Sequence, residues 1–251
     1  MSLSLKGKNA LVTGSSRGIG RAIAERLAAD GAAVVVNYTS QKKAAQELVN
    51  KIVDRGGKAV AIQADIAKTS EVRRLFAEAE KAVGRLDIVV ANAAVFLGKS
   101  LIESTEEDYD YVFNVNTRGA FFTLQEAARR VSDGGRIIVV STGGTKMFFP
   151  NASLYIGSKG AVEQFARGLS RELGQRSVTV NILSPGYTET DMLKNAADKL
   201  ESQNIREIGA SQSPFSRIGT SEDVADVAGF LASDDARWVT GQNIQAGGGV
   251  I

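Results

Sequence analysis

The sequence predicts an α/β fold with one parallel sheet that is covered by helices on both faces. Short apolar runs alternate along the 251 residues with longer segments whose apolar residues recur every three or four positions. Strands that alternate with helices form parallel sheets, because each crossover connection is long enough to hold a helix. No low-complexity linker or change of composition marks a second domain, so we expect a single domain over residues 1–251.

The seven predicted strands are short and rich in Val, Ile and Ala. They span residues 9–14, 33–38, 59–65, 87–93, 136–141, 178–185 and 243–247. The first strand runs into a glycine-rich turn and then into a helical pattern that ends at Gly31. The polar segment 187–220, after the sixth strand, is longer than a simple crossover. Ligands of such sheets bind at the carboxyl ends of the strands, so we expect 187–220 to be a lid over the ligand.

Composition excludes several classes of function. The chain has 30 Lys and Arg against 28 Asp and Glu, without a basic run that would bind nucleic acid. No apolar stretch approaches the roughly 20 residues of a membrane span, and the start lacks the apolar core of a secretory signal. The absence of Cys and His excludes disulfides, thiolate catalysis, a catalytic zinc site and a Ser-His-Asp triad. We therefore expect a cytoplasmic protein that uses no metal and acts on a small molecule.

The turn after the first strand, "TGSSRGIGRAIA", predicts a dinucleotide site of the Rossmann type. Gly14 allows a tight turn, while Gly18 and Gly20 let the backbone approach a pyrophosphate that faces the helix N-terminus. An NAD site carries a carboxylate at the end of the second strand, but Asn37 and Tyr38 stand there. Arg17 inside the glycine turn offers a guanidinium for a 2′-phosphate, which favours NADP(H). The side chain of Asp65, at the end of the third strand, could reach the adenine amino group or cap the next helix.

The stretch "SLYIGSKGAVEQFA" places Tyr155 and Lys159 four residues apart on a predicted helix. A free phenol has a pKa of about 10 and is a poor acid or base at neutral pH. A lysine on the same helical face would favour the phenolate and lower the pKa of Tyr155. In a chain without histidine, this pair is the candidate for proton transfer.

The motifs "TGSSRGIG", "YIGSK" and "SPGYTET", in this order, resemble those of the classical short-chain dehydrogenase/reductase family over essentially the whole chain. The resemblance implies that Tyr155 is the general acid/base and that Lys159 lowers its pKa and binds the nicotinamide ribose. Ser141 would bond the substrate carbonyl, and Asn116 would hold a water in the proton relay. The residues expected to bind NADP(H) are Gly14, Ser16, Arg17, Gly18, Ile19, Gly20, Asn37, Tyr38, Asp65, Ile66, Asn92, Ala93, Ala94, Tyr155, Lys159, Pro185, Gly186, Thr188 and Thr190.

The sequence departs from the family pattern in two places. Ala91 and Ala94 replace an asparagine and a glycine of the usual N-N-A-G, and a methyl at Ala94 would crowd the cofactor ribose. Thr142 directly follows Ser141, and many members space the serine and the tyrosine one residue closer, which would select Thr142. We prefer Ser141, because "STGGTKMFFPNASLYIGSK" resembles, without gaps, the corresponding stretch of fungal hydroxynaphthalene reductases.

These features predict an NADP(H)-dependent carbonyl reductase. The alternatives are a 3-oxoacyl-[acyl-carrier-protein] reductase, for which Arg129 and Arg130 would offer a basic surface, and a non-catalytic cofactor-binding sensor or scaffold. The family resemblance also implies a homotetramer with interfaces around 104–130 and 153–174. Apolar residues of the lid and of the segment before the Tyr155 helix indicate either an apolar pocket or core and subunit contacts. They are Met147, Phe148, Phe149, Met192, Leu193, Ile205, Ile208 and Phe215.

Overall fold

The structure is a computed structural model that describes residues 4–147, 149–199 and 204–251. Its sheet has seven parallel strands in the order β3-β2-β1-β4-β5-β6-β7, which confirms the predicted fold class. The strands are β1 (Asn9–Val12), β2 (Ala33–Tyr38), β3 (Lys58–Gln63), β4 (Ile88–Ala91), β5 (Arg136–Val140), β6 (Thr179–Pro185) and β7 (Asn243–Ala246). β1 ends before the predicted 14, because Gly14 turns the chain with a φ of +61°.

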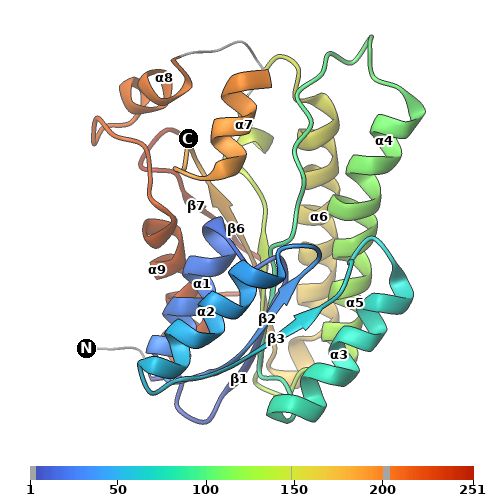
Figure 1. The fold of residues 1–251 in the computed structure, drawn as a ribbon, viewed down its shortest axis with the longest axis vertical. Helices are drawn as coiled ribbons and strands as arrows, with labels where there is room; N and C mark the ends of the chain where they lie inside the picture. Colours follow the sequence, from blue (N-terminus) through green and yellow to red (C-terminus); the bar gives the residue numbers. More distant parts are fainter. Residues whose placement is uncertain (1–3, 148, 200–203) are drawn as a thin grey trace.

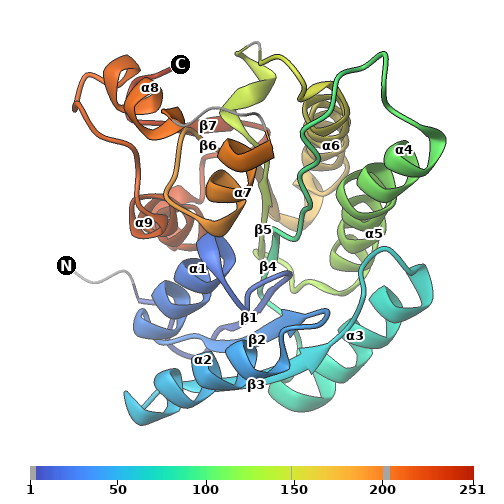
Figure 2. The ribbon, with the colours of Figure 1, turned by 45° about the horizontal axis from the view of Figure 1, so that its top comes forward.

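Helices cover both faces of the sheet (Figures 1 and 2). The α-helices are α1 (Gly18–Ala29), α2 (Lys42–Asp54), α3 (Thr69–Val83), α4 (Glu106–Phe113), α5 (Ala120–Arg130), α6 (Ser153–Glu172), α7 (Asp191–Lys199), α8 (Ile205–Gln212) and α9 (Ser221–Ala232). A π-helical turn, Asn114–Gly119, joins α4 to α5. Short 3₁₀ turns occupy Gly143–Thr145, Gly174–Arg176 and Asp234–Ala236.

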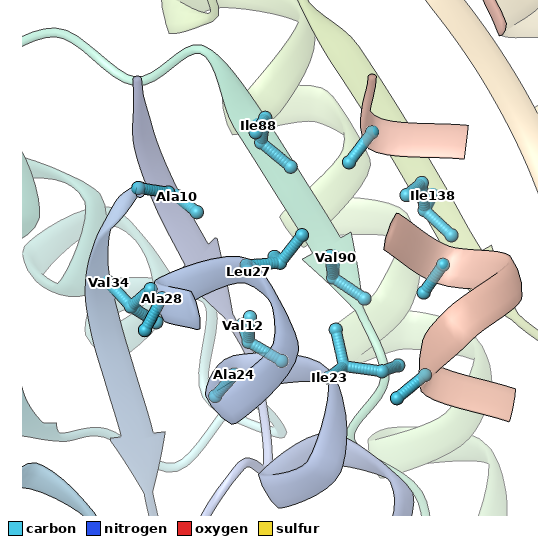
Figure 3. Packing of buried hydrophobic residues seen from close by; sticks show 14 of the residues in the cluster. Ala10, Val12, Ile23, Ala24, Leu27, Ala28, Val34, Ile88, Val90 and Ile138 are labelled. Carbon is cyan, nitrogen blue, oxygen red and sulfur yellow. The ribbon is translucent and has the colours of Figure 1, made fainter. Parts of the chain in front are cut away.

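The sheet divides the apolar core into two parts, because successive side chains of a strand point to opposite faces. On one face, Val12, Val34 and Val90 pack against Ile23 and Leu27 of α1, as Figure 3 shows, together with residues of α2 and α9. The other face carries Leu11, Val35 and Val89 against α3, α5 and α6. Burial on both faces explains why the strands read as continuous apolar runs.

The functional end of the sheet is set by its topology. The chain leaves β1 toward β2 and β3 on one side, and β4 then pairs with the other side of β1. Loops therefore diverge at the carboxyl ends of β1 and β4, where open α/β sheets bind ligands. The segment 187–220 forms α7 and α8 above this edge (Figure 2). Its two ends meet, since the Gly219 N–H donates to the Tyr187 carbonyl at 2.8 Å.

Candidate active site

A cavity of about 760 Å³ opens at the carboxyl ends of the strands. Its walls are the glycine turn, the ends of β2 to β6, the start of α6 and the first part of the lid. All but two of the sequence-predicted site residues line it, the exceptions being Asn37 and Asn116. Phe148, which was proposed for the apolar pocket, lies outside the described residues.

The glycine turn is built for the close approach of a ligand. Gly14 and Gly18 have positive φ values of +61° and +54°, which side chains other than glycine rarely adopt. A Cβ at Gly20 would lie 2.4 Å from Asn92 Nδ2. That amide donates to the Gly14 carbonyl at 3.1 Å and to the Thr13 carbonyl at 2.9 Å. Asn92 therefore acts on the turn from the neighbouring strand, and the resulting cradle before α1 fits a pyrophosphate.

Asn37 does not face the cavity, and the prediction that it contacts the cofactor is wrong. Its side chain is buried, with Oδ1 accepting from the Gly14 N–H at 3.1 Å. Its Nδ2 donates to the carbonyl oxygens of Ala64 and Ile62 at 3.1 and 3.3 Å. The amide thus joins the glycine turn to β3, which satisfies the polar groups of a buried site. The cavity is lined instead by Tyr38, which was predicted, and by residues 39–41, which were not.

Arg17 and Asp65, two further residues predicted to bind the cofactor, line the cavity and also make contacts within the protein. Arg17 is exposed, and its guanidinium lies 3.7 Å from Asp191 at the start of α7. Asp65 lines the cavity, and its Oδ1 accepts from the Ala67 N–H at 3.0 Å. This bond forms an Asx turn rather than a helix cap, since α3 begins only at Thr69.

Tyr155 and Lys159 lie in the first two turns of α6 and face the cavity. Thr142, which follows β5, lines the same cavity, and its hydroxyl acts to lower the pKa of the Tyr155 phenol. Thr142 Oγ1 also accepts from the Gly144 N–H at 3.1 Å, which starts the 3₁₀ turn. The edge of the Phe96 ring packs against Tyr155, with centroids 5.2 Å apart and planes at 71°.

Ser141 makes its side-chain hydrogen bond to α6. Its Oγ donates to Glu163 Oε1 at 2.7 Å, and its side chain is buried. Both Ser141 and Thr142 line the cavity, but the Ser141 hydroxyl is bonded to Glu163, so the geometry favours Thr142 rather than the preferred Ser141 as the hydroxyl open to a substrate.

Burial governs the charges of the Tyr155 and Lys159 pair. It raises the pKa of the Tyr155 phenol to about 12, against a smaller lowering by the Thr142 hydroxyl. It also lowers the pKa of the Lys159 amine to about 8, with Glu163 acting in the opposite direction. Lys159 Nζ donates to the Val140 carbonyl at 2.7 Å. The expected lowering of the Tyr155 pKa by Lys159 is therefore absent from this structure, and the phenol is protonated at neutral pH.

Asn116 lies in the π-helical turn and is fully buried. Its Oδ1 accepts from the Val95 N–H at 2.8 Å, and its Nδ2 donates to the Val95 carbonyl at 2.9 Å. The same amide donates to Ser158 Oγ at 3.1 Å, and Ser158 in turn donates to the Tyr155 carbonyl. Asn116 therefore holds the loop after β4 against the helix that carries Tyr155.

The end of β6 and the residues after it complete the cavity wall with Pro185, Gly186, Thr188 and Thr190. A Cβ at Gly186 would lie 2.8 Å from the Gly247 Cα, so this position holds the loops after β6 and β7 together. The remaining predicted residues of the cofactor site, Ser16, Ile19, Ile66, Ala93 and Ala94, also line the cavity. Ala91 is buried at the end of β4.

The outer part of the cavity is apolar and aromatic. Phe149 packs edge-on against Tyr187 of the lid, with ring centroids 5.8 Å apart. Other lining side chains are Met147, Ile156, Met192, Leu193 and Ile205. These contacts support the pocket interpretation of Met147, Phe149, Met192, Leu193 and Ile205. Ile208 and Phe215 are instead exposed.

Comparison with known proteins agrees with this geometry. The family model described as enoyl-(acyl carrier protein) reductase matches residues 14–251. The hydroxynaphthalene reductase-like protein Arp2 of Metarhizium brunneum is 46% identical over 257 residues, which cover 99% of this chain and 96% of that protein. The chain belongs to the short-chain dehydrogenase/reductase family. It is thus an enzyme of a family that acts on carbonyl and CH–OH groups.

Two solved structures, a short-chain dehydrogenase and a ketoreductase, share its fold closely. One, from Burkholderia cenocepacia in complex with NADP, has a TM-score of 0.91 and 40% identity and covers 98% of both chains. The other, the landomycin C-6 ketoreductase LanV with bound NADP and rabelomycin, has a TM-score of 0.88 and 40% identity. That match covers 98% of this chain and 97% of LanV.

Two searches of the structure bear on other functions. Among the residues that the structure describes, none of the helices combines the length and apolar character of a membrane span. The same residues contain no group of three or more acidic, His or Cys side chains that would hold a metal ion.

Proposed function

We propose that this short-chain dehydrogenase/reductase reduces a ketone with NADPH, with Tyr155 as the acid that protonates the nascent alkoxide. The observation that carries the proposal is the convergence of Tyr155, Thr142 and Lys159 on the cavity beside the glycine turn. NADPH, when bound, supplies the hydride. A phenol that is protonated at neutral pH suits the direction of carbonyl reduction.

In this mechanism Thr142 holds the carbonyl oxygen. Its Oγ1 already accepts from the Gly144 N–H, so its own hydrogen is available to the substrate oxygen. Lys159 supplies positive charge next to the proton donor, and charge of this sign stabilises a developing oxyanion. Asn116 is a positioning residue, because its side chain bonds both Val95, in the loop after β4, and Ser158 on α6.

The test of this mechanism uses Tyr155→Phe with NADPH and a reactive ketone. The turnover rate should fall about 10²–10⁴-fold, the usual effect of losing a general acid, while the affinity for NADPH stays close to that of the wild type. Tyr111→Phe is the matched control, because this exposed tyrosine also lines the cavity but lies on α4. Unchanged turnover by Tyr155→Phe would refute the assignment.

We propose NADP(H) as the cofactor because no carboxylate lines the cavity at the end of β2. Ser40 and Thr39 line this part, and the exposed Arg17 guanidinium stands at the adjacent glycine turn. Arg17→Ala should weaken NADPH binding about tenfold or more, the scale of a charge-assisted hydrogen bond, and leave NADH binding unchanged. Arg21→Ala is the control, because Arg21 pairs with Glu25 on the same helix. Equal dissociation constants of the wild type for NADPH and NADH would exclude the assignment.

We propose a planar, aromatic ketone as the substrate. The support is the pocket beside Tyr155, which Phe96, Phe149 and Tyr187 line with aromatic rings. LanV, a relative in fold and sequence, was solved with rabelomycin. An assay of NADPH oxidation against polycyclic ketones, quinones, naphthols, aliphatic ketones and acyl thioesters tests this class. Preference for acyl thioesters would instead identify a carrier-protein reductase. The basic surface expected for that alternative is largely neutralised, since Glu126 pairs with Arg129 and Arg130 and Glu80 also pairs with Arg130.

We also propose that the chain is one domain with a lid at 187–220 and that it assembles as a homotetramer. The strand β7 is an edge of the sheet, next to the exposed Trp238. Within the described residues, Asn243 Nδ2 and Gln245 Oε1 on this strand are buried without a hydrogen-bond partner. A second apolar surface includes Tyr109 and Phe121 of α4 and α5. Light scattering on the purified protein measures the mass, and a monomer would refute the assembly.

A further inference from the structure

A buried carboxylate lies directly behind the catalytic groups. Glu163 is one helical turn after Lys159 on α6, and its exposed fraction is only 4%. Its Oε1 accepts hydrogen bonds from Ser141 Oγ and from Thr145 Oγ1, both at 2.7 Å. Carboxylates are rarely buried unless they are paired and hydrogen-bonded, so the position of this one requires an explanation.

The two hydroxyl donors stand on either side of Thr142. Ser141 precedes it at the end of β5, and Thr145 closes the 3₁₀ turn that Thr142 begins. Thr145 Oγ1 also lies 3.1 Å from the Thr142 carbonyl oxygen, but its single hydrogen is donated to Glu163 over the shorter distance of 2.7 Å. One oxygen of Glu163 therefore accepts hydrogen bonds from both sides of Thr142, which lines the cavity together with Tyr155.

The charge of Glu163 lies between two cations. Lys159 is on the side of the active site, and Arg167 Nη2 lies 3.9 Å from Glu163 Oε2 on the other side. The carboxylate counteracts the lowering of the Lys159 pKa by burial. The ionisable groups of this cluster are thus Tyr155, Lys159 and Arg167 on the same helix, while β5 contributes the Val140 carbonyl and the Ser141 hydroxyl.

We propose that Glu163 is a positioning residue that fixes the Thr142 loop through Ser141 and Thr145 and sets its negative charge against the Lys159 ammonium. The proposal rests on the proposed roles of Thr142 and Lys159. It also gives Ser141 a role in the site, since its hydroxyl supports the loop rather than the substrate. A glutamine at position 163 could accept the same hydrogen bonds from Ser141 and Thr145. An experiment can therefore isolate the effect of the negative charge of Glu163.

The experiment compares the wild type with Glu163→Gln across pH, for both ketone reduction and NADPH binding by fluorescence. The amide oxygen can still accept from the two hydroxyls, but the charge is lost. The pKa of Lys159 should fall further, so the alkaline limb of both profiles should move roughly one unit toward lower pH. At about pH 8 the variant should be up to tenfold weaker than the wild type, and at about pH 6 the two should agree within about twofold.

Glu126→Gln is the matched control, because Glu126 is a buried carboxylate that pairs with arginines on α5. Its profiles should be those of the wild type. Ser141→Ala and Thr145→Val test whether the hydrogen bonds to Glu163 fix the Thr142 loop. These two variants still test the proposal if Glu163→Gln does not fold. Each should lower kcat about three- to tenfold without moving either pH profile, since the charge remains.

Two results would overturn the proposal: pH profiles of Glu163→Gln that match the wild type, or full kcat in both hydroxyl variants. A uniform loss of activity at every pH, together with a lower melting temperature, would identify Glu163 as merely structural. The binding profile separates this failure from that of the proposed function. If no ketone is reduced but NADPH binding shows the shifted limb, the role of Glu163 toward Lys159 stands and the reaction is wrong.

Discussion

Lys159→Met should stabilise the protein against unfolding while it removes activity. The amine is 3% exposed, and burial lowers its pKa from 10.5 to about 8. At about 1.4 kcal/mol for each pH unit, holding the ammonium in the folded state costs about 3 kcal/mol at neutral pH. Methionine loses the hydrogen bond to the Val140 carbonyl, which offsets about 1 kcal/mol. The net gain of about 2 kcal/mol should raise Tm by roughly 4–8 °C for a domain of this size.

The pH dependence of this gain follows from the same pKa. Between about pH 8 and 10.5 the unfolded chain keeps a proton on Lys159 that the folded chain has released. The wild type therefore becomes more stable as the pH rises through this window, and the advantage of Lys159→Met should shrink. Tyr155 titrates the opposite way, since its raised pKa makes the folded state lose stability above about pH 10, but it does so in both proteins.

Thermal unfolding of the ligand-free proteins at about pH 7 and about pH 10 measures both effects, with Lys146→Met as an exposed-lysine control. If the Tm of Lys159→Met at neutral pH is lower than that of the wild type, the buried Lys159 ammonium does not destabilise the folded state as we expect. A Tm difference that stays constant with pH would refute the pKa argument. Turnover with NADPH should be lost in either case, because the lysine serves the reaction.

Three further predictions concern the cavity wall. Thr142→Val should lower kcat about 10²–10³-fold, which is the effect of losing one oxyanion donor. Ser141→Ala should lower kcat by less than about tenfold, because its hydroxyl is bonded to Glu163. If steady-state kinetics show the reverse order of these two effects, Ser141 is the carbonyl donor. In Asn37→Asp the bonds to the buried carbonyl oxygens are lost, so urea unfolding should show a destabilisation of about 1–3 kcal/mol. The variant should not prefer NADH over NADPH. A clear switch to NADH would place this side chain at the cofactor after all. Gly20→Ala should weaken NADPH binding more than about tenfold, or about 1.4 kcal/mol, because the new methyl would lie 2.4 Å from Asn92 Nδ2. An unchanged dissociation constant for NADPH would show that the turn can relax.

Local sequence determined the fold and the place of the site. The alternation of apolar runs with helical periods predicts a parallel sheet, because burial on both faces and long crossovers leave a pattern that needs no knowledge of distant contacts. The glycine turn is equally local, since the backbone conformations of Gly14 and Gly18 require glycine at those positions. Tyr155 and Lys159 could be paired from the sequence because both lie on the same face of one helix.

Only the tertiary structure decided which of two neighbouring groups serves the site. Ser141 and Thr142 are adjacent hydroxyls, and the packing of α6 against β5 brings Ser141 to Glu163, while Thr142 lines the cavity together with Tyr155. Asn37 stands where a cofactor contact is expected, but the buried Gly14 N–H and Ala64 carbonyl require its amide as a partner. The pKa of Tyr155 likewise depends on desolvation by the packed fold, which outweighs the lowering by the Thr142 hydroxyl. Side-chain direction and burial are properties of the packed fold, and no local pattern of residue types encodes them.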